Sequence, residues 1–172
     1  MIGFFSKIFG GNKSEKDVKK ILPVVQKVAQ HFTGYSSLSN DQLRQKTQEF
    51  RQRIQAHLAP TDEAIASKNK QAEELPFNDL MGKDAIYQEV DKLKKDRDKK
   101  IEEILEEILP EAFATVKETA RRFKENTAII STATQLDRDL SVKKEYITIV
   151  PGTPSGDGDK SIFKNTWSAG GS

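Results

Sequence analysis

The sequence predicts a mainly α-helical protein: an amphipathic N-terminal helix, several further helices including a long charged one, and then a C-terminal β-hairpin. Apolar residues recur at helical spacing through most of the first 125 positions, whereas β-branched residues gather on both sides of a Gly/Pro-rich turn after residue 150. Leu, Ile, Val and Phe number 42 of the 172 residues, about 24%, which exceeds the roughly 20% below which disorder is typical. A modest hydrophobic core is therefore expected.

The composition excludes several classes of function. The chain has no Cys, which rules out a disulfide framework, a thiolate zinc site and a cysteine nucleophile. Its two histidines, His31 and His57, have no matching partners for a metal cluster or a histidine triad. Lys+Arg 28 against Asp+Glu 26 leaves a charge of only +2, so we expect no nucleic-acid partner. No apolar run could cross a bilayer and no secretory signal is evident, so a cytoplasmic protein is expected.

Residues 1–12 are predicted to form an amphipathic helix, ended by Gly10-Gly11. At 100° per residue, six apolar positions fall within an arc of about 160°, while Ser6, Lys7 and Gly10 fall outside it. The six are Met1, Ile2, Phe4, Phe5, Ile8 and Phe9. A lysine-rich stretch follows, and the combination suits an anionic membrane surface. The alternative is that this apolar stripe packs on the rest of the protein or on a partner subunit, and the residues alone leave both interpretations open.

Two helices are expected next. Helical periodicity runs from Lys13 to about His31, with a kink at Pro23, and its apolar positions are Val18, Ile21, Leu22, Val25 and Val28. The second helix begins with Ser39 as N-cap, Gln42 closing a capping box and Leu38 packing on Leu43. We expect this helix to end at Ala59-Pro60, with Leu43, Phe50, Ile54 and Leu58 on one face.

The sequence predicts a weaker helix over residues 61–75 and a loop over residues 76–82. A long charged helix is expected over residues 84–109. Acids and bases are nearly balanced in the long helix, which favours an exposed helix or one arm of a helical hairpin over a binding surface. Two ion pairs at i,i+4 are expected on its solvent side: Asp91 with Lys95 and Asp96 with Lys100.

Pro110 is predicted to stop this helix and start another, because proline is tolerated in a first helical turn. Four residues are expected on the buried face of the new helix: Phe113, Val116, Ala120 and Phe123. The basic cluster Arg121, Arg122 and Lys124 stands beside glutamates and is interpreted as a solvated face. Two strands around the Gly/Pro turn, at residues 145–150 and 161–167, then predict the hairpin.

A search for catalytic chemistry is negative. Two glycine stretches, at residues 10–14 and 156–161, are superficially similar to a phosphate-binding loop, but Asn12 and Asp159 stand where the loop requires glycine. Asp157 and Asp159 lack the remaining ligands of a calcium loop. No carboxylate pair is placed in an apolar cleft that would raise a pKa. The sequence therefore predicts no catalytic, cofactor-binding or metal-binding residue.

Three blocks of sequence closely resemble, in this order, the N-terminus of the SecA family, the ATP-driven motor subunits of the bacterial preprotein translocase. They are Ile8-Phe9-Gly10, the segment from Leu38 to Arg51, and the segment from Leu109 to Arg122. None of the blocks is a catalytic motif. The family's Gly-Glu-Gly-Lys-Thr phosphate loop has no counterpart in these residues, so we expect a truncated start of a RecA-like α/β motor domain.

The resemblance implies that residues 1–12 contact acidic phospholipid and the SecYEG channel at the inner face of the plasma membrane. The contact residues it implies are Ile2, Phe4, Phe5, Lys7, Ile8 and Phe9. ATP and Mg would be cofactors of the full-length protein, a protein-transporting ATPase with preprotein as its cargo, and this chain alone would hold no cofactor. A homodimer is one assembly that the resemblance allows.

Residues 13–125 would then form an N-terminal helical region. Compared with compact family members, two segments look like insertions. Residues from about 59 to 107 would be a helical arm, and residues from about 124 to 172 would hold a β-hairpin, in 126–172. The alternative to a translocase segment is a stand-alone helical adaptor that docks on membranes or partner helices through its first ten residues. The sequence beyond Ser172 would separate the two.

Overall fold

The computed structural model describes residues 13–153 and 158–165, and the predicted helix of residues 1–12 lies outside them. The described part is mainly helical, as expected, and its last residues form a small antiparallel sheet. The chain divides into two compact units, which we call the junction unit (residues 1–44 and 110–172) and the hairpin unit (residues 45–109). Among the described residues, no helix combines the length and the apolar character that a membrane span requires.

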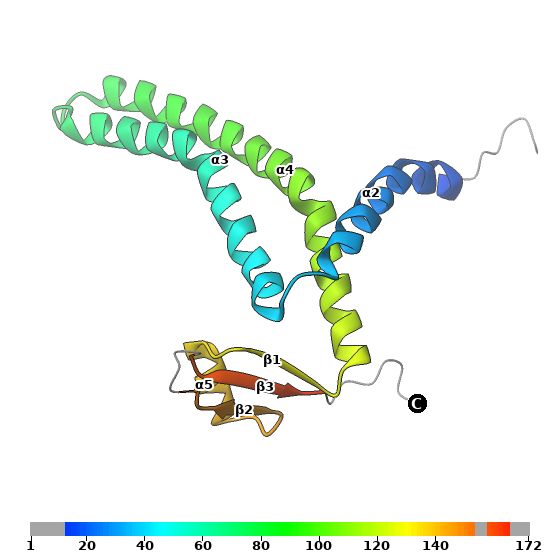
Figure 1. The fold of residues 1–172 in the computed structure, drawn as a ribbon. Helices are drawn as coiled ribbons and strands as arrows, with labels where there is room; N and C mark the ends of the chain where they lie inside the picture. The colour runs from blue at the N-terminus through cyan, green and yellow to red at the C-terminus, as the bar shows by residue number, and fades with distance from the viewer. Residues whose placement is uncertain (1–12, 154–157, 166–172) are drawn as a thin grey trace, which may run out of the picture. The chain divides into compact units, whose positions relative to one another are not determined.

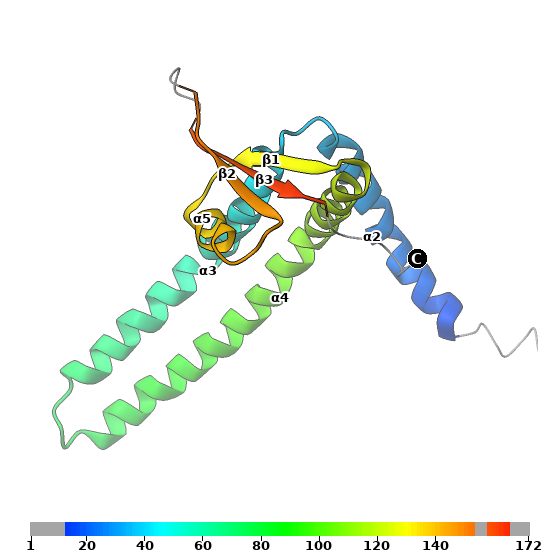
Figure 2. The same ribbon diagram turned by 90° about the horizontal axis from the view of Figure 1, so that it is seen from below.

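The hairpin unit consists of two antiparallel helical arms. Helix α3 (Asn40–Glu74) and helix α4 (Leu80–Glu125) supply one arm each and run side by side in both ribbon views (Figures 1 and 2). The seam between the arms is apolar, and its most buried members are Leu58, Ala72, Val90, Ile104 and Ile108. The interpretation of the charged stretch as one arm of a helical hairpin is therefore confirmed.

Ion pairs join the arms along the edges of the seam. The Nη2 atom of Arg53 lies 2.7 Å from Oε1 of Glu107, and Lys68 pairs with Glu89. Along α4, Lys100 lies 3.1 Å from Asp96 as predicted. Asp91, however, pairs with Lys94 at 3.8 Å, so the predicted partner Lys95 was wrong; both spacings bring side chains to the same helix face.

The predicted ends at Pro60 and Pro110 were wrong, because both prolines lie inside continuous helices. Proline removes one hydrogen bond and crowds the preceding turn, at a cost of about 3 kcal/mol. Just after Pro60 the arm is held by the buried Thr61, whose hydroxyl accepts a 2.7 Å hydrogen bond from Lys100. Around Pro110 the buried side chains of Ile108 and Ala114 lie on both sides of the proline. Packing on both sides thus outweighs the local cost.

The junction unit contains helix α2 (Lys13–Tyr35), the first residues of α3 and the last part of α4. Its apolar cluster is small: Tyr35, Leu43 and Ala114, with Val28, Phe32 and Leu38 packed against it. The capping box that opens α3 is confirmed, since the Ser39 N–H donates to Gln42 at 2.8 Å and the Gln42 N–H donates to the Ser39 hydroxyl at 3.1 Å.

The sheet has three strands, β1 (Ala128–Thr132), β2 (Ile147–Val150) and β3 (Lys160–Lys164), in the order β1-β3-β2. The predicted hairpin of β2 and β3 is confirmed, with Ile149 opposite Ser161. The sequence prediction missed β1, which also pairs antiparallel with β3, and helix α5 (Gln135–Ser141), which contacts β2. The hairpin thus gains the support that two isolated strands would lack.

Candidate functional site

Helix α2 presents an exposed apolar stripe that makes it the candidate docking surface of the junction unit. Four side chains at the spacing i, i+3, i+4 and i+7 are half or more exposed: Val18 (59%), Ile21 (57%), Leu22 (50%) and Val25 (52%). At 100° per residue they share an arc of about 100°, while the exposed Lys16, Lys20 and Lys27 fall on the opposite side. We call these four apolar residues the α2 stripe.

An apolar face opposite a lysine-rich face is typical of helices that lie in the plane of a membrane interface or dock on a partner helix. The helical spacing of the α2 stripe is visible in the sequence, but periodicity alone does not distinguish a core face from a docking face. The lysines on the opposite side are the signal that could have indicated docking. The contact residues implied by the family resemblance, Ile2 to Phe9, lie outside the described residues.

The second feature of this unit is a buried polar network at the C-terminal end of α4. Its buried stripe is Ala114, Glu118 and Arg122, at i, i+4 and i+8, with exposed fractions of 0%, 0% and 8%. The predicted buried face was wrong, since Phe113 is 57% and Val116 is 67% exposed. The interpretation of Arg122 as part of a solvated face was wrong as well. We call Glu118, Arg122 and Asn40 the Arg122 network.

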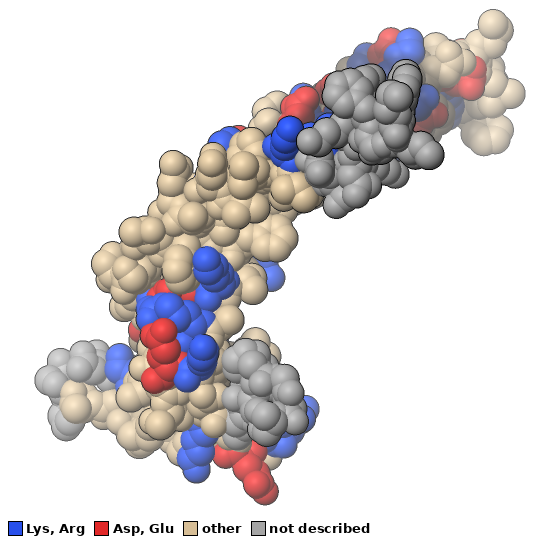
Figure 3. All heavy atoms as spheres, turned by 90° about the vertical axis from the view of Figure 1, so that its right-hand side faces the viewer, with Lys and Arg blue, Asp and Glu red and all other residues tan. Residues whose placement is uncertain are grey.

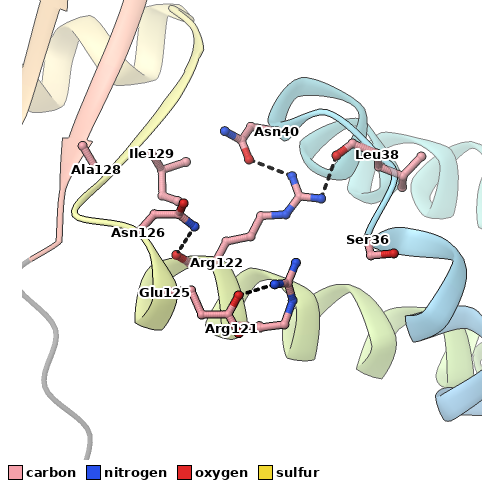
Figure 4. Close-up of a pocket in the computed structure, with 9 residues that line it drawn as sticks. All are labelled: Ser36, Leu38, Asn40, Arg121, Arg122, Glu125, Asn126, Ala128 and Ile129. Carbon is pink, nitrogen blue, oxygen red and sulfur yellow. Dashed lines mark hydrogen bonds and ion pairs between the residues drawn. The ribbon is translucent and has the colours of Figure 1, made fainter.

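Arg122 ties together the ends of three chain segments. Its guanidinium donates to the Tyr35 carbonyl at the end of α2 (3.0 Å) and to the Leu38 carbonyl in the following turn (2.7 Å). It also donates to the Asn40 side chain at the start of α3 (2.7 Å). Nε donates to Glu118 at 2.8 Å. Figure 4 shows Arg122 reaching from α4 toward Leu38 and Asn40, which explains why a charged side chain is buried here.

Arg121 completes the charge balance of the Arg122 network. It donates two 2.8 Å hydrogen bonds to Glu118 and also pairs with Glu125. Hydrogen bonds from Arg121, helped by Arg122, lower the pKa of Glu118 although burial opposes the shift. The hydrogen bonds to Glu118, together with the negative charges of Glu118 and Glu125, raise the pKa of Arg121. On the face in Figure 3, basic and acidic side chains adjoin each other, so the visible charge is mixed rather than of one sign.

A second ion pair joins the exposed Arg44 of α3 to the buried Asp137 of α5, next to the sheet. Burial raises the pKa of Asp137, but hydrogen bonds from Arg44 and from the backbone and hydroxyl of Thr134 outweigh it, so the pKa lies below its usual range. Arg44 Nη1 lies 2.8 Å from Asp137 Oδ2, and the Ser161 hydroxyl donates to the same oxygen at 3.1 Å. Asp41 adds contacts to the backbone N–H of Thr132 (2.7 Å) and to its hydroxyl (2.8 Å).

The pocket beside the Arg122 network has a volume of about 270 Å³ and a mostly polar lining that includes Ser36, Asn126 and Ile129 (Figure 4). Four donor contacts of the Arg122 guanidinium already go to protein acceptors, so this arrangement acts as a structural clamp rather than as an anion site. Within residues 13–153 and 158–165, no group of three His, Asp or Glu side chains could hold a metal ion.

Comparison with known proteins places these units in a family. The sequence model of the SecA DEAD-like domain matches residues 5–135. The chain is 42% identical over 168 residues to the protein translocase subunit SecA of Parabacteroides distasonis, covering 98% of this chain and 14% of that protein. It is also 42% identical over 165 residues to SecA of Christiangramia forsetii, covering 96% of this chain and 14% of that protein.

The chain thus spans about 14% of the length of the curated relatives it matches. No solved structure matches it. The family match includes α2, the whole of the hairpin unit, the Arg122 network and β1, and it stops at the start of α5. Since the match covers well over half of the residues, the chain belongs to the SecA family.

Proposed function

We propose that this chain is the N-terminal part of an ATP-driven preprotein translocase and supplies its docking to acidic phospholipid and to the SecYEG channel. The observation that carries this proposal is the exposed α2 stripe opposite exposed lysines. In the sequence the stripe begins at Val18, a few residues after the amphipathic segment of residues 1–12, and we propose that the two contribute to one docking surface. That segment contributes Ile2, Phe4, Phe5, Lys7, Ile8 and Phe9.

Under this proposal the protein works at the inner face of the plasma membrane as a peripheral component. ATP and Mg serve the full-length motor, whose preprotein cargo and nucleotide chemistry belong to residues other than these. The region near 59–107 is a helical insertion within an N-terminal helical region of residues 13–125, and residues 126–172 form a separate β-hairpin insertion. The DNA downstream of the Ser172 codon tests this assignment, because a Gly-Glu-Gly-Lys-Thr phosphate loop is expected there.

Co-sedimentation with lipid vesicles tests the docking role. We expect the chain to bind anionic vesicles more strongly than zwitterionic ones, and to lose binding as salt screens its lysines. The double variants Phe4→Ser/Phe5→Ser and Ile21→Ser/Leu22→Ser should each weaken binding to anionic vesicles.

The variant Val142→Ser is a matched control, because Val142 is 86% exposed and lies outside both segments. It should bind like the parent chain. Unchanged vesicle binding in both double variants would contradict the docking role. Circular dichroism of each variant checks that the helix content is preserved.

A further inference from the structure

The turn between the two arms of the hairpin unit carries three large apolar side chains that face solvent. Phe77, Leu80 and Met81 are 92%, 71% and 87% exposed. They lie where the chain passes from α3 into α4, at the far end of the antiparallel pair in Figures 1 and 2. Single exposed apolar residues are common on soluble proteins, but a contiguous group of large ones marks an interaction site. We call these three residues the hairpin tip.

Hydrogen bonds within the turn define its conformation. The backbone N–H of Asp79 donates to the Pro76 carbonyl at 3.0 Å, and the Lys83 N–H donates to the Asp79 carbonyl at 3.2 Å. The Asp79 carboxylate accepts from the Gly82 N–H at 2.9 Å, which caps the start of α4. A Cβ at position 82 would collide with that carboxylate. The turn therefore has a defined conformation in which the hairpin tip is presented rather than packed into the seam.

Beside the hairpin tip lies a shallow depression of about 370 Å³, lined by Leu80, Met81, Asp84, Ala85 and Gln88. It joins two of the tip residues to a carboxylate, so an apolar ligand group seated here would have a negative charge next to it. Methionine adapts its unbranched, polarizable side chain to differently shaped partners, which suits recognition of more than one sequence.

The charge around the hairpin tip is negative. Residues 71–88 hold four exposed acids against one lysine, Lys83, whose Nζ lies 5.9 Å from the centre of the Phe77 ring. The acids are Glu73, Glu74, Asp79 and Asp84, of which Glu74 pairs with Lys70 at 3.8 Å. An anionic lipid surface would be repelled by this charge, whereas a segment carrying lysine or arginine would be attracted. The tip thus differs from the α2 stripe, where an apolar face is combined with lysines.

We propose that the hairpin tip binds polypeptide segments in which large apolar side chains stand beside lysine or arginine. The apolar part of such a segment covers Phe77, Leu80 and Met81, and its cations lie against the surrounding carboxylates. The surface is small compared with a stable protein–protein interface, so the contact is weak and reversible. The proposal stands independently of the docking role of α2.

Fluorescence anisotropy with a labelled synthetic peptide of leucine and lysine in an amphipathic repeat tests the proposal, with the full chain as the binding partner. We expect the variant Phe77→Ser/Leu80→Ser/Met81→Ser to lose about tenfold or more in affinity, a change of about 1.4 kcal/mol. The charge variant Glu73→Lys/Glu74→Lys should also bind more weakly while leaving the apolar residues in place.

Two controls make the test specific. Val142→Ser removes an equally exposed apolar side chain elsewhere, and Glu102→Lys/Glu106→Lys reverses two exposed charges on the shaft of α4; both should bind like the parent. A peptide with glutamate in place of lysine should bind more weakly than the lysine peptide.

The proposal is overturned if the tip variant binds the lysine peptide as the parent does, or if the glutamate peptide binds equally well. It is also overturned if the tip substitutions abolish binding to anionic vesicles or concentration-dependent self-association of the chain while peptide binding persists. In those cases the hairpin tip would bind a lipid surface or a second copy of this chain instead of a peptide.

Discussion

The two units of this chain differ in what stabilises each of them internally. In the hairpin unit, apolar side chains such as Val90 and Ile104 fill the seam, and the ion pairs lie at its exposed edges. In the junction unit, the buried positions include three charged residues, Glu118, Arg122 and Asp137. The hairpin unit thus resembles a coiled coil, whereas the junction unit depends on buried hydrogen-bonded charge.

This difference in buried polarity follows from where the helices end, because backbone groups at helix ends lack the hydrogen bonds of a regular helix. Two long antiparallel helices satisfy their own backbone groups along the whole seam, so apolar packing is sufficient. In the junction unit α2 ends and α3 begins within a few residues, which leaves carbonyl groups such as those of Tyr35 and Leu38 without helical partners. Arg122 donates to both, and a neutral side chain could not supply as many donors.

The largest effect is expected from Arg122→Ala. This substitution leaves Glu118 buried without one of its partners and removes the donors to two carbonyls, so the free energy of unfolding should fall by about 3–5 kcal/mol. Urea unfolding measures the loss, and hydrogen exchange should show reduced protection around residues 35–43 and 114–122. Lys124→Ala, at an exposed position two residues away, should change stability by no more than about 0.5 kcal/mol. Similar losses in the two variants would contradict the clamp role of Arg122.

The variant Ile104→Ala probes the apolar seam in the same way. Ile104 is 4% exposed, and truncation of a buried isoleucine to alanine costs about 2–5 kcal/mol. Leu105→Ala is the matched control, because the side chain of Leu105, next to Ile104 in the sequence, is 48% exposed. Its truncation should therefore lower the free energy of unfolding much less. Equal urea midpoints for Ile104→Ala and Leu105→Ala would show that the seam is not the main support of the hairpin unit.

Acid should weaken the junction unit through Asp137. The pKa of this carboxyl is lowered in the folded chain, so its ionised form contributes stability above the ordinary value near 3.8, and that contribution is lost as the pH falls below it. Asp137→Asn removes the charge-assisted bonds to Arg44 and should cost about 1.5–3 kcal/mol at neutral pH. Unfolding measured between neutral and acid pH should then show a smaller pH dependence in the variant. An unchanged slope would argue against this ion pair.

The smallest effect is expected at the edge of the hairpin seam. Glu107 pairs with Arg53, but its side chain is 64% exposed, and exposed ion pairs contribute about 0–1 kcal/mol. Glu107→Ala should therefore lower the urea midpoint slightly at low salt and have still less effect at high salt. A loss as large as that of Ile104→Ala would mean that ion pairs, rather than apolar packing, hold the arms together.

Local patterns predicted much of the secondary structure. The capping box at Ser39 and Gln42 was predictable because its two hydrogen bonds join residues three apart in the sequence. Proline rules failed at Pro60 and Pro110, because tertiary packing on both sides of each proline kept the helix continuous. Strand β1 was missed, since its five residues alternate only weakly and are recognisable mainly through their pairing with β3.

The candidate site was predicted less well. Hydrophobicity assigns Phe113 and Val116 to the core and Glu118 and Arg122 to solvent, and the structure reverses both assignments. The reason is that Arg122 can be buried because its guanidinium donates hydrogen bonds to two backbone carbonyls. Those carbonyls lie 84 and 87 residues away in the sequence. No pattern within a single helix contains that information.

The sequence by itself determined the helical character, the helix start at Ser39, the β2–β3 hairpin and the family resemblance, because each rests on residues close together in the chain or on shared blocks of sequence. Only the tertiary structure decided which face of α4 is buried, that α3 and α4 continue through their prolines, and that β1 completes the sheet. These features depend on partners distant in sequence, whose packing and hydrogen bonds outweigh local preference.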